Sequence, residues 1–371
     1  MKSECITGDV FQFMEQLAPR QLAYDWDPVG LQVGSHNKPV KKVMVTLDVL
    51  EAVVDEAIAE NVDVIIAHHP LLFKPVQQIN TTTPTGRIIQ KLLTNDITVY
   101  AAHTNLDITK NGVNDALCDA IGITNTRVLV EKESEQLIKL AVYVPKTHVE
   151  EVRNAISEAG AGHIGNYSHC TFQTTGLGTF KPLKGTNPFI GSVDQLERVE
   201  EVKLESIIEQ SKLPSALNAI RQSHPYEEPA YDLFPLKNEG NVYGLGRIGE
   251  LTKTVDLKTF CNHVKASLKL DHLRVIGKLD KQVKTVAVLG GSGEKFIHQA
   301  KRQGADVFIT GDMTFHLAQD AQEMGLAVID AGHYAEKVMK TSVQEYLISC
   351  FSDTNVEVIV STTNTNPFQY V

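Results

Sequence analysis

Two adjacent histidines, His68 and His69, end an apolar run in the stretch VDVIIAHHPLLF, residues 62–73. Successive side chains of a regular strand point to opposite faces, so two neighbouring imidazoles meet at one site only where a strand ends and the chain turns. Pro70 favours such a bend, because it keeps the preceding residue extended. One core histidine beside one surface histidine is the alternative. We interpret the pair as candidate metal ligands.

Three further candidates follow other apolar segments. Asp107 comes after the strand-like run ITVYAAHTNLD, and we expect it on a loop, where an Asp can also be a simple turn residue. His333 and Glu336 lie three apart in DAGHYAEK, where a helix is predicted to begin near Tyr334. That spacing puts both on one helix face, an arrangement found in carboxylate-rich metal sites. Helix capping and a dipole-favoured Glu are the alternative reading.

Together these residues indicate a dinuclear metal site. Five ligands exceed what one tetrahedral zinc requires, and they suit two ions held by histidines with a bridging carboxylate. Mixed nitrogen and oxygen ligands favour Zn, Fe, Mn, Co or Ni over Ca or Mg. Metal-bound histidines also need orienting acceptors, so His103, Asp312 and His316 are candidates for orienting ligands or lining the cleft.

An internal repeat would bring these residues together. The segment from Val43, VMVTLDVLEAVVDEAIAENVDVIIAHHPLLF, aligns without a gap to the segment from Val286, VAVLGGSGEKFIHQAKRQGADVFITGDMTFH, so that Asp63 matches Asp306. Both read as strand, helix and parallel strand, and a third apolar strand with a histidine and an acid follows in each half. Polar groups therefore gather at the carboxyl ends of parallel strands, where open α/β sheets place ligands.

A different pattern separates the two halves. Residues 136–236 read as strand, helix, strand, strand, helix and strand, which is the ferredoxin-like βαββαβ order. The stretch KPLKGTNPFIGSVDQ predicts a long loop, and the charged clusters EKESEQ and KNEGN predict linkers. The expected fold is α/β, with two pseudo-twofold-related lobes (1–135 and 237–371) forming one core around an inserted ferredoxin-like domain (136–236).

Composition excludes several classes of protein. The 371 residues carry a net charge of −10, which argues against nucleic-acid binding through a broad basic face. No apolar run reaches the roughly 18 residues of a membrane span, and the N-terminal stretch has acids where a signal peptide is apolar. Five scattered cysteines without a CxxC indicate a reducing cytoplasm. The GGSG of residues 290–293 could cradle a phosphate, but it fits a tight turn between strand and helix better.

Several short motifs together resemble the Nif-three-like family, whose bacterial members are GTP cyclohydrolase 1 type 2 homologs. The motifs are DWDPVGLQVG (25–34), IIAHHPLLF (65–73), HTNLD (103–107), GRIGEL (246–251), GGSG (290–293), TGDMTFH (310–316) and AGHYAEK (331–337). The resemblance implies a dinuclear metal centre between two lobes, with ligands His68, His69, Asp107, His333 and Glu336. It also implies a middle domain similar to CutA and PII proteins, and a toroidal homohexamer.

The function predicted from these features is metal-dependent hydrolysis of a nucleotide-like substrate or another phosphoester. Two bridged cations would lower the pKa of a shared water, so no serine or cysteine nucleophile is required. The resemblance implies GTP as a candidate substrate, although the sequence contains no recognisable guanine pocket. The alternative is a hexameric scaffold that binds or senses metal without catalysis, and an open coordination position would separate the two.

Overall fold

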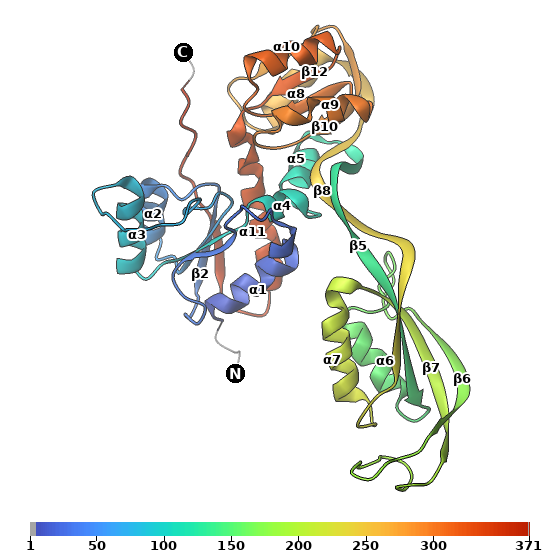
Figure 1. The fold of residues 1–371 in the computed structure, drawn as a ribbon. Helices are drawn as coiled ribbons and strands as arrows, with labels where there is room; N and C mark the ends of the chain where they lie inside the picture. Colours follow the sequence, from blue (N-terminus) through green and yellow to red (C-terminus); the bar gives the residue numbers. More distant parts are fainter. Residues whose placement is uncertain (1–4, 370) are drawn as a thin grey trace. The chain divides into compact units, whose positions relative to one another are not determined.

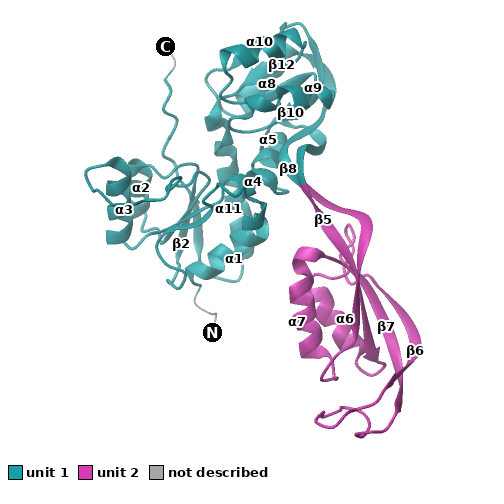
Figure 2. Ribbon diagram, in the orientation of Figure 1, with its two compact units in different colours: residues 1–132, 243–371 teal, residues 133–242 magenta. Residues whose placement is uncertain are grey.

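The computed structural model describes residues 5–369 and 371 and groups the chain into two compact units. One unit comprises Met1–Lys132 and Tyr243–Val371, and the other comprises Glu133–Val242 (Figure 2). The chain passes from one unit to the other within β5 (Thr124–Pro145) and returns within β8 (Tyr231–Asp256). The protein is a mixed α/β protein with two sheets, which agrees with the α/β class predicted from the sequence.

A five-stranded sheet in the first unit has the order β1-β4-β3-β2-β13. Its strand β2 is labelled in Figure 1. Strands β13, β2, β3 and β4 are parallel, and β1 is antiparallel to β4. Strands β3 and β4 are buried at every position, which explains why parallel strands of this kind read as continuous apolar runs. The strands are β1 (Gly30–Val33), β2 (Lys42–Thr46), β3 (Val64–Ala67), β4 (Thr98–Ala101) and β13 (Glu357–Val360).

The second sheet has the order β6-β7-β5-β8-β10-β11-β12-β9. Within the first unit, β10, β11 and β12 are parallel, whereas β8 and β9 pair antiparallel to β10 and β12. These strands are β9 (Arg274–Ile276), β10 (Gln282–Val288), β11 (Val307–Thr310) and β12 (Ala327–Asp330). Because β10, β11 and β12 are parallel, their carboxyl ends lie at one edge, as they do for β2, β3 and β4.

The two sheets share one arrangement over four strands. Three parallel strands are followed by an antiparallel strand beside the third, namely β2-β3-β4-β1 in one sheet and β10-β11-β12-β9 in the other. Asp63 and Asp306, which match in the sequence repeat, make equivalent hydrogen bonds. Asp63 Oδ2 accepts the amides of residues 41 and 42 at 2.7 and 2.9 Å, and Asp306 Oδ2 accepts those of residues 284 and 285 at 2.9 Å each. Each carboxylate therefore fastens its strand to the parallel neighbour.

Helices pack on both faces of each sheet in the first unit. Side chains alternate along the strands, so Val43 and Val45 of β2 enter the core between the sheets while Met44 packs against α2 and α3. The central core holds α1, α5, α8 and α11, and α9 and α10 cover the far face of the second sheet. These helices are α1 (Thr7–Leu17), α2 (Glu51–Ala59), α3 (Pro84–Thr94), α5 (Val113–Ile121), α8 (Leu257–Ser267), α9 (Ile297–Arg302), α10 (Phe315–Glu323) and α11 (Met339–Cys350).

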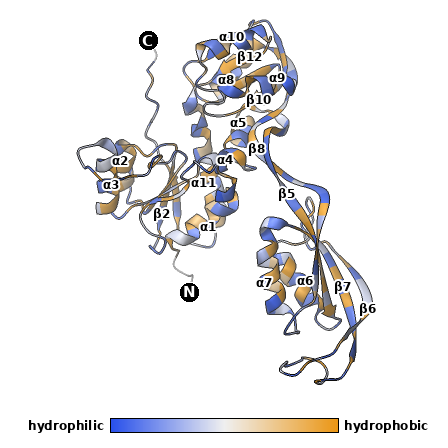
Figure 3. Ribbon diagram, viewed as in Figure 1, coloured by the Kyte–Doolittle hydropathy of each residue, from blue (hydrophilic) through white to orange (hydrophobic). Residues whose placement is uncertain are grey.

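The strands and α-helices of the second unit follow the order β5-α6-β6-β7-α7-β8. Its core lies between the sheet and the two helices, which carry apolar and polar sides, as the mixed colours of α7 show (Figure 3). The segment between β6 and β7 contains no helix or strand, as predicted for the long loop. The remaining elements are α6 (Val149–Glu158), β6 (Thr171–Phe180), β7 (Glu197–Glu209) and α7 (Leu213–Ser223).

The charged clusters EKESEQ and KNEGN lie where the chain passes between the two units, as predicted for linkers, but both lie inside the long strands β5 and β8 instead of in loops. Two glycines of β8 permit the close pairing. A Cβ at Gly240 would lie 2.1 Å from the carbonyl oxygen of Glu135, and one at Gly244 would lie 2.1 Å from that of Val130. The charged side chains remain in water while their backbones pair, and composition alone does not distinguish such a ribbon from a loop.

Among the described residues, none of the helices is both long and apolar enough to pass through a lipid bilayer.

Candidate metal centre

The histidine pair begins where β3 ends. The amide of His68 donates to the carbonyl of Thr46 at 3.2 Å, and that of His69 donates to Leu47 at 2.9 Å. The pair therefore continues beside the end of β2 while the chain turns toward Pro70. The ring centroids lie 4.9 Å apart, so both imidazoles face the same region, as the sequence predicts.

One ring nitrogen of His68 is held by a hydrogen bond, and the other faces the site. Its Nδ1 lies 2.9 Å from the carbonyl oxygen of Ala102, and a carbonyl can only accept, so Nδ1 carries the proton. Nε2 is then unprotonated and carries a lone pair. It is buried, and within the described part of the chain it has no hydrogen-bond partner. A buried lone pair without a donor is the ligand atom that a cation requires.

His69 and His333 are oriented in the same manner by carboxylates. His69 Nδ1 lies 2.7 Å from Asp48 Oδ1, and His333 Nδ1 lies 2.7 Å from Asp312 Oδ2. Both Nε2 atoms lie 3.3 Å from Glu336 Oε2. One glutamate oxygen thus stands between two imidazoles from opposite halves of the chain.

The two predicted carboxylates come from short helices. Asp107 lies in α4 (Thr104–Ile108) rather than on the expected loop, because the chain turns into a helix directly after His103. Glu336 lies in the 3-10 helix η4 (His333–Val338), whose side chains three apart eclipse, and this brings it beside His333. Asp107 Oδ1 and Glu336 Oε2 lie 3.6 and 3.7 Å from His68 Nε2.

The predicted residues form overlapping groups whose ligand atoms lie within 4.8 Å of one another. Among the described residues these groups are His68, His69 and His103; His69, His333 and Glu336; and His68, Asp107 and Glu336. All five predicted ligands are therefore brought together, from segments as much as 268 positions apart.

The structure also places the three residues whose roles the sequence left open. His103 belongs to the cluster, and its Nδ1 lies 2.9 Å from Asp27 Oδ1. Asp312 orients His333. His316 is exposed on α10, where its Nδ1 lies 3.4 Å from Gln319 Oε1, outside the clusters.

Sequence reasoning missed the two orienting carboxylates Asp27 and Asp48. Each was in view: Asp27 lies within the DWDPVG motif, and Asp48 follows the apolar strand ending at Thr46. Neither spacing reveals an imidazole partner, because His103 and His69 come from distant segments. Acceptors on Nδ1 are the usual outer support of a metal-binding histidine.

The chain matches one known protein family over nearly its full length. The model of the family Duf34/NIF3 (NGG1p interacting factor 3) matches residues 6–367. The chain belongs to the Duf34/NIF3 family.

Relatives in the Duf34/NIF3 family match over the full length. The chain is 52% identical over 364 residues to the GTP cyclohydrolase 1 type 2 homolog of Bacillus subtilis (strain 168), covering 98% of each protein. It is similar to the crystal structure of a Bacillus cereus protein related to NIF3, with 49% identity, a TM-score of 0.93 and 100% of both chains covered. It is also similar to Staphylococcus aureus protein SA1388, at 34% identity and a TM-score of 0.76, again over 100% of both chains.

In this Duf34/NIF3 chain, the negative carboxylates of the centre favour protonation of the two outer histidines, His69 and His333, when no cation is bound. Burial opposes protonation of His69, but hydrogen bonds with Asp48 and Glu336 raise its pKa to about 10. Hydrogen bonding to Glu336 raises the pKa of His333 to about 9 despite partial burial. Burial opposes ionisation of Glu336 as well, yet contacts with His333 and His69 hold its pKa below the usual range.

The inner residues His68 and Asp107 have pKa values shifted toward their neutral forms. Burial lowers the pKa of His68 to about 3, so its imidazole is neutral. Burial and the nearby Glu336 raise the pKa of Asp107 well above its usual value. The Oδ1 atom of Asp107 is buried and, within the described residues, accepts no hydrogen bond. A cation would satisfy this oxygen together with His68 Nε2 and displace protons from the outer histidines, so the residues present fit a metal.

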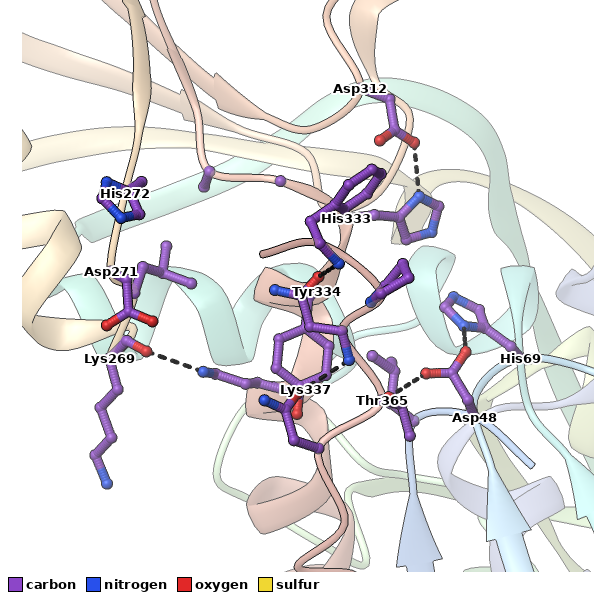
Figure 4. Close-up of a pocket in the computed structure, with 18 residues that line it drawn as sticks. Asp48, His69, Lys269, Asp271, His272, Asp312, His333, Tyr334, Lys337 and Thr365 are labelled. Carbon is purple, nitrogen blue, oxygen red and sulfur yellow. Dashed lines mark hydrogen bonds and ion pairs between the residues drawn. The ribbon is translucent and has the colours of Figure 1, made fainter. Parts of the chain in front are cut away.

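A cavity of about 440 Å³ opens beside the outer histidines (Figure 4). His69, His333 and Asp312 lie on one side, and Lys269, Asp271, His272 and Lys337 lie on the other. The side chain of His333 is 39% exposed, whereas those of His68 and Glu336 are 0% and 3% exposed. The centre is thus closed on its inner side and open toward this cavity.

The backbone of the GGSG loop passes close to the side chain of Glu336. A Cβ at Gly291 (φ +62°) would lie 2.7 Å from Glu336 Oε1, and one at Gly290 would lie 3.0 Å from it. The Gly290 amide donates to Asn114 Oδ1 at 3.0 Å and that of Gly293 donates to Thr310 Oγ1 at 3.0 Å, so these two donors are used within the protein. Glycine here permits the backbone to approach the buried carboxylate.

Proposed function

We propose that this Duf34/NIF3 protein is a hydrolase that binds two divalent metal ions and acts on a nucleotide-like substrate. The observation that supports it most is the convergence of histidine Nε2 atoms on two buried carboxylates beside an open cavity. His68 Nε2 and Asp107 Oδ1 lack hydrogen-bond partners among the described residues, which is costly for buried polar atoms unless a cation binds there.

His68, His69, Asp107, His333 and Glu336 would hold the ions, and Zn, Fe, Mn, Co and Ni suit this mixed ligand set. When bound, two such ions lower the pKa of a shared water and polarise the scissile group. Two carboxylates of the chain already hold the ligand histidines in position. Asp48 and Asp312 fix the imidazoles of His69 and His333, so little reorganisation is needed when a ligand binds.

His103 is placed to handle a proton. Its Nδ1–H donates to Asp27, whose second oxygen accepts the amide of Thr104 at 2.9 Å. This holds the ring with its Nε2 lone pair toward the centre, where it can accept a proton from a reacting water or complete a metal shell.

The substrate proposal draws on the relatives and on the cavity. The printed name of the Bacillus subtilis relative refers to GTP cyclohydrolase, and this supports including GTP among the candidates. The cavity contains both cationic and anionic side chains, among them Lys269, Lys337 and Asp271, which suits a polar substrate rather than a lipid.

Metal content and turnover test the proposal together. Protein purified without chelator should contain transition metal by elemental analysis and hydrolyse at least one member of a panel of GTP, other nucleotides and phosphoesters. His68→Ala should lose both properties, whereas His316→Ala should keep both, because His316 is an exposed histidine outside the cluster. Protein that retains no transition metal under any purification, or turnover that persists in His68→Ala, would refute the proposal.

A metal-binding or sensing scaffold is the second candidate, and the burial of His68 and Glu336 favours it. A storage site closes all coordination positions with protein ligands, whereas a catalytic one leaves a position open. Metal that stays bound in the presence of chelator, with no turnover of the panel, would select the scaffold.

We also infer that the two sheets of the first unit are pseudo-twofold-related lobes and that the second unit is a ferredoxin-like insertion similar to CutA and PII proteins. The shared strand arrangement and the equivalent hydrogen bonds of Asp63 and Asp306 support the first inference. The βαββαβ order supports the second.

A further inference from the structure

Three aromatic side chains gather at the surface beside the metal centre. Trp26 and Tyr24 are stacked, with ring centroids 5.8 Å apart and planes at 9°, and Phe73 lies 5.8 Å from Trp26 at 52°. Trp26 is 58% exposed and Phe73 is 50% exposed. We call Tyr24, Trp26 and Phe73 the aromatic platform.

One imidazole separates the platform from the metal centre. The His103 ring centroid lies 6.3 Å from both Trp26 and Phe73 and meets each ring edge to face. On its other side, His103 lies 5.2 Å from His68 and 5.6 Å from His69. A molecule resting on the platform would therefore have its edge next to the reacting groups.

The platform is anchored from beneath. The Tyr24 amide donates to Thr104 Oγ1 at 3.2 Å, and the Asp27 amide donates to the Tyr24 carbonyl at 2.9 Å. The Lys132 ammonium lies 5.0 Å from the Tyr24 ring centroid and donates to the carbonyls of Leu22 and Ala23. Trp26 is thus held between Tyr24 and the buried Asp27, so its exposure does not result from a loose segment.

A planar heteroaromatic ring is the occupant that these properties favour. Aromatic faces stack on nucleobases without regard to base identity, because each base has a π-face. Trp26 and Phe73 stay 58% and 50% exposed despite their contacts with His103, so both rings retain surface on which such a ring can stack. A contact between copies of the chain would also cover the rings, but continuity with the metal centre through His103 favours the substrate.

We propose that the aromatic platform stacks the nucleobase of the substrate and thereby presents it to the metal centre. This inference rests on the proposed function, since it names the substrate class of the same site. The chemistry recognised is a planar heteroaromatic ring attached to a sugar phosphate.

Intrinsic fluorescence provides a direct test, because Trp26 is the only tryptophan in the sequence. Titration of the full-length, metal-loaded protein with GMP or AMP should quench its emission saturably. Ribose 5-phosphate, which has the same sugar phosphate without a base, should not. Absence of saturable quenching by either nucleotide would overturn the proposal.

Substitutions then locate the binding. Phe73→Leu should raise the dissociation constant for GMP by roughly 5- to 100-fold, the range expected for loss of one stacking partner. Phe315→Leu is the matched control, since Phe315 is 72% exposed on α10 and its ring contacts His316, and it should bind GMP as the wild type does. Equal affinity of the Phe73→Leu variant and the wild type would contradict the platform. Metal content should match the wild type in both variants, which excludes misfolding as the cause.

The two proposals fail separately. GMP binding at the platform without hydrolysis of any nucleotide or phosphoester would remove the hydrolase and leave the platform. Hydrolysis of ribose 5-phosphate by a protein whose Trp26 responds to no nucleotide would leave the hydrolase and remove the platform. A fall in molecular mass of Trp26→Leu in sedimentation, with GMP affinity of Phe73→Leu unchanged, would assign the rings to a contact between copies.

Discussion

Each imidazole of the centre is fixed through Nδ1 and presents Nε2 inward. The acceptors differ, being a backbone carbonyl for His68 and carboxylates for His69, His103 and His333. Burial keeps His68 neutral, whereas hydrogen bonds with carboxylates stabilise positive charge on the more exposed His69 and His333. Histidine is thus neutral at the inner position, His68, and positively charged at the outer positions, His69 and His333, when no metal is bound.

Asp107→Ala should lose metal while keeping the fold. The Oδ1 of this carboxylate is buried and has no hydrogen-bond partner among the described residues, so its removal should change the unfolding free energy of the metal-free protein by no more than about 1 kcal/mol. Elemental analysis and urea unfolding measure the two effects. Asp119→Ala is the control, because Asp119 is an exposed carboxylate on nearby α5. Wild-type metal content in Asp107→Ala would show that the ligand is misassigned.

Asp48→Asn should weaken metal binding through His69. An amide can still contact Nδ1, but it removes the charge that orients the ring, and loss of such outer support lowers metal affinity roughly 10- to 100-fold. Competition with a chromogenic chelator measures the change. Thr365→Val removes only the hydroxyl that donates to Asp48 Oδ2, so a smaller effect is expected. If both variants weaken binding equally, orientation of His69 by the carboxylate is not the cause.

At the scale of elements, strand ends determine the site. Strand β3 ends directly before His68. The short helices α4 and η4 begin three residues after the ends of β4 and β12 and present Asp107 and Glu336. The C-terminal segment after β13 forms part of the cavity wall through Asn364–Phe368. It is fastened to α2 through Glu56.

The attachment of the C-terminal segment to α2 depends on pH through the ionisation of Glu56. Burial opposes its ionisation, but hydrogen bonds from Ser361, Thr362 and Thr363 lower its pKa from 4.5 to about 2. Below pH 4.5 the unfolded chain takes up a proton that the folded carboxylate does not. The stabilisation is therefore present above pH 4.5 and lost as the pH falls toward about 2.

Glu56→Gln should accordingly destabilise the protein at pH 7 by about 1 kcal/mol or less, because solvent screens this partly exposed group. The difference from wild type should shrink at pH 3, as followed by urea unfolding. Glu60→Gln, which alters only an exposed carboxylate near Lys42, is the comparison variant. A difference that stayed constant with pH would show that ionisation of Glu56 contributes nothing.

At the scale of the whole molecule, the second unit is connected by paired strands. The backbones of β5 and β8 approach closely at Val130 and Gly244, so the chain leaves and re-enters the first unit at neighbouring positions. Removal of residues 133–242, with Lys132 joined to Tyr243 through a short glycine-serine turn, should give a folded protein that retains metal. Solubility and elemental analysis test this, and an insoluble product would contradict an autonomous insertion.

The homohexamer implied by the resemblance stays a prediction, and the edge strand β6 supports contact between copies. Its sequence TFQTTGLGTF has no charged residue, and Phe172 and Leu177 are 67% and 59% exposed. Edge strands without charge readily pair with another chain. Leu177→Lys should lower the mass found in sedimentation, whereas Leu183→Lys in the following loop should not. A monomeric wild type would contradict the prediction.

The amino-acid sequence was enough to predict the α/β class, the repeated strand-helix-strand pattern and the candidate set His68, His69, Asp107, His333 and Glu336. These features are local: apolar runs, spacing and side-chain type are visible along a single stretch. Only the folded chain shows which ring nitrogen faces inward and that His103 joins the cluster. It also revealed Asp27 and Asp48 as orienting partners and showed that the charged linkers are paired strands. Those outcomes depend on hydrogen bonds between segments far apart in the chain, and no periodicity within one segment encodes its distant partner.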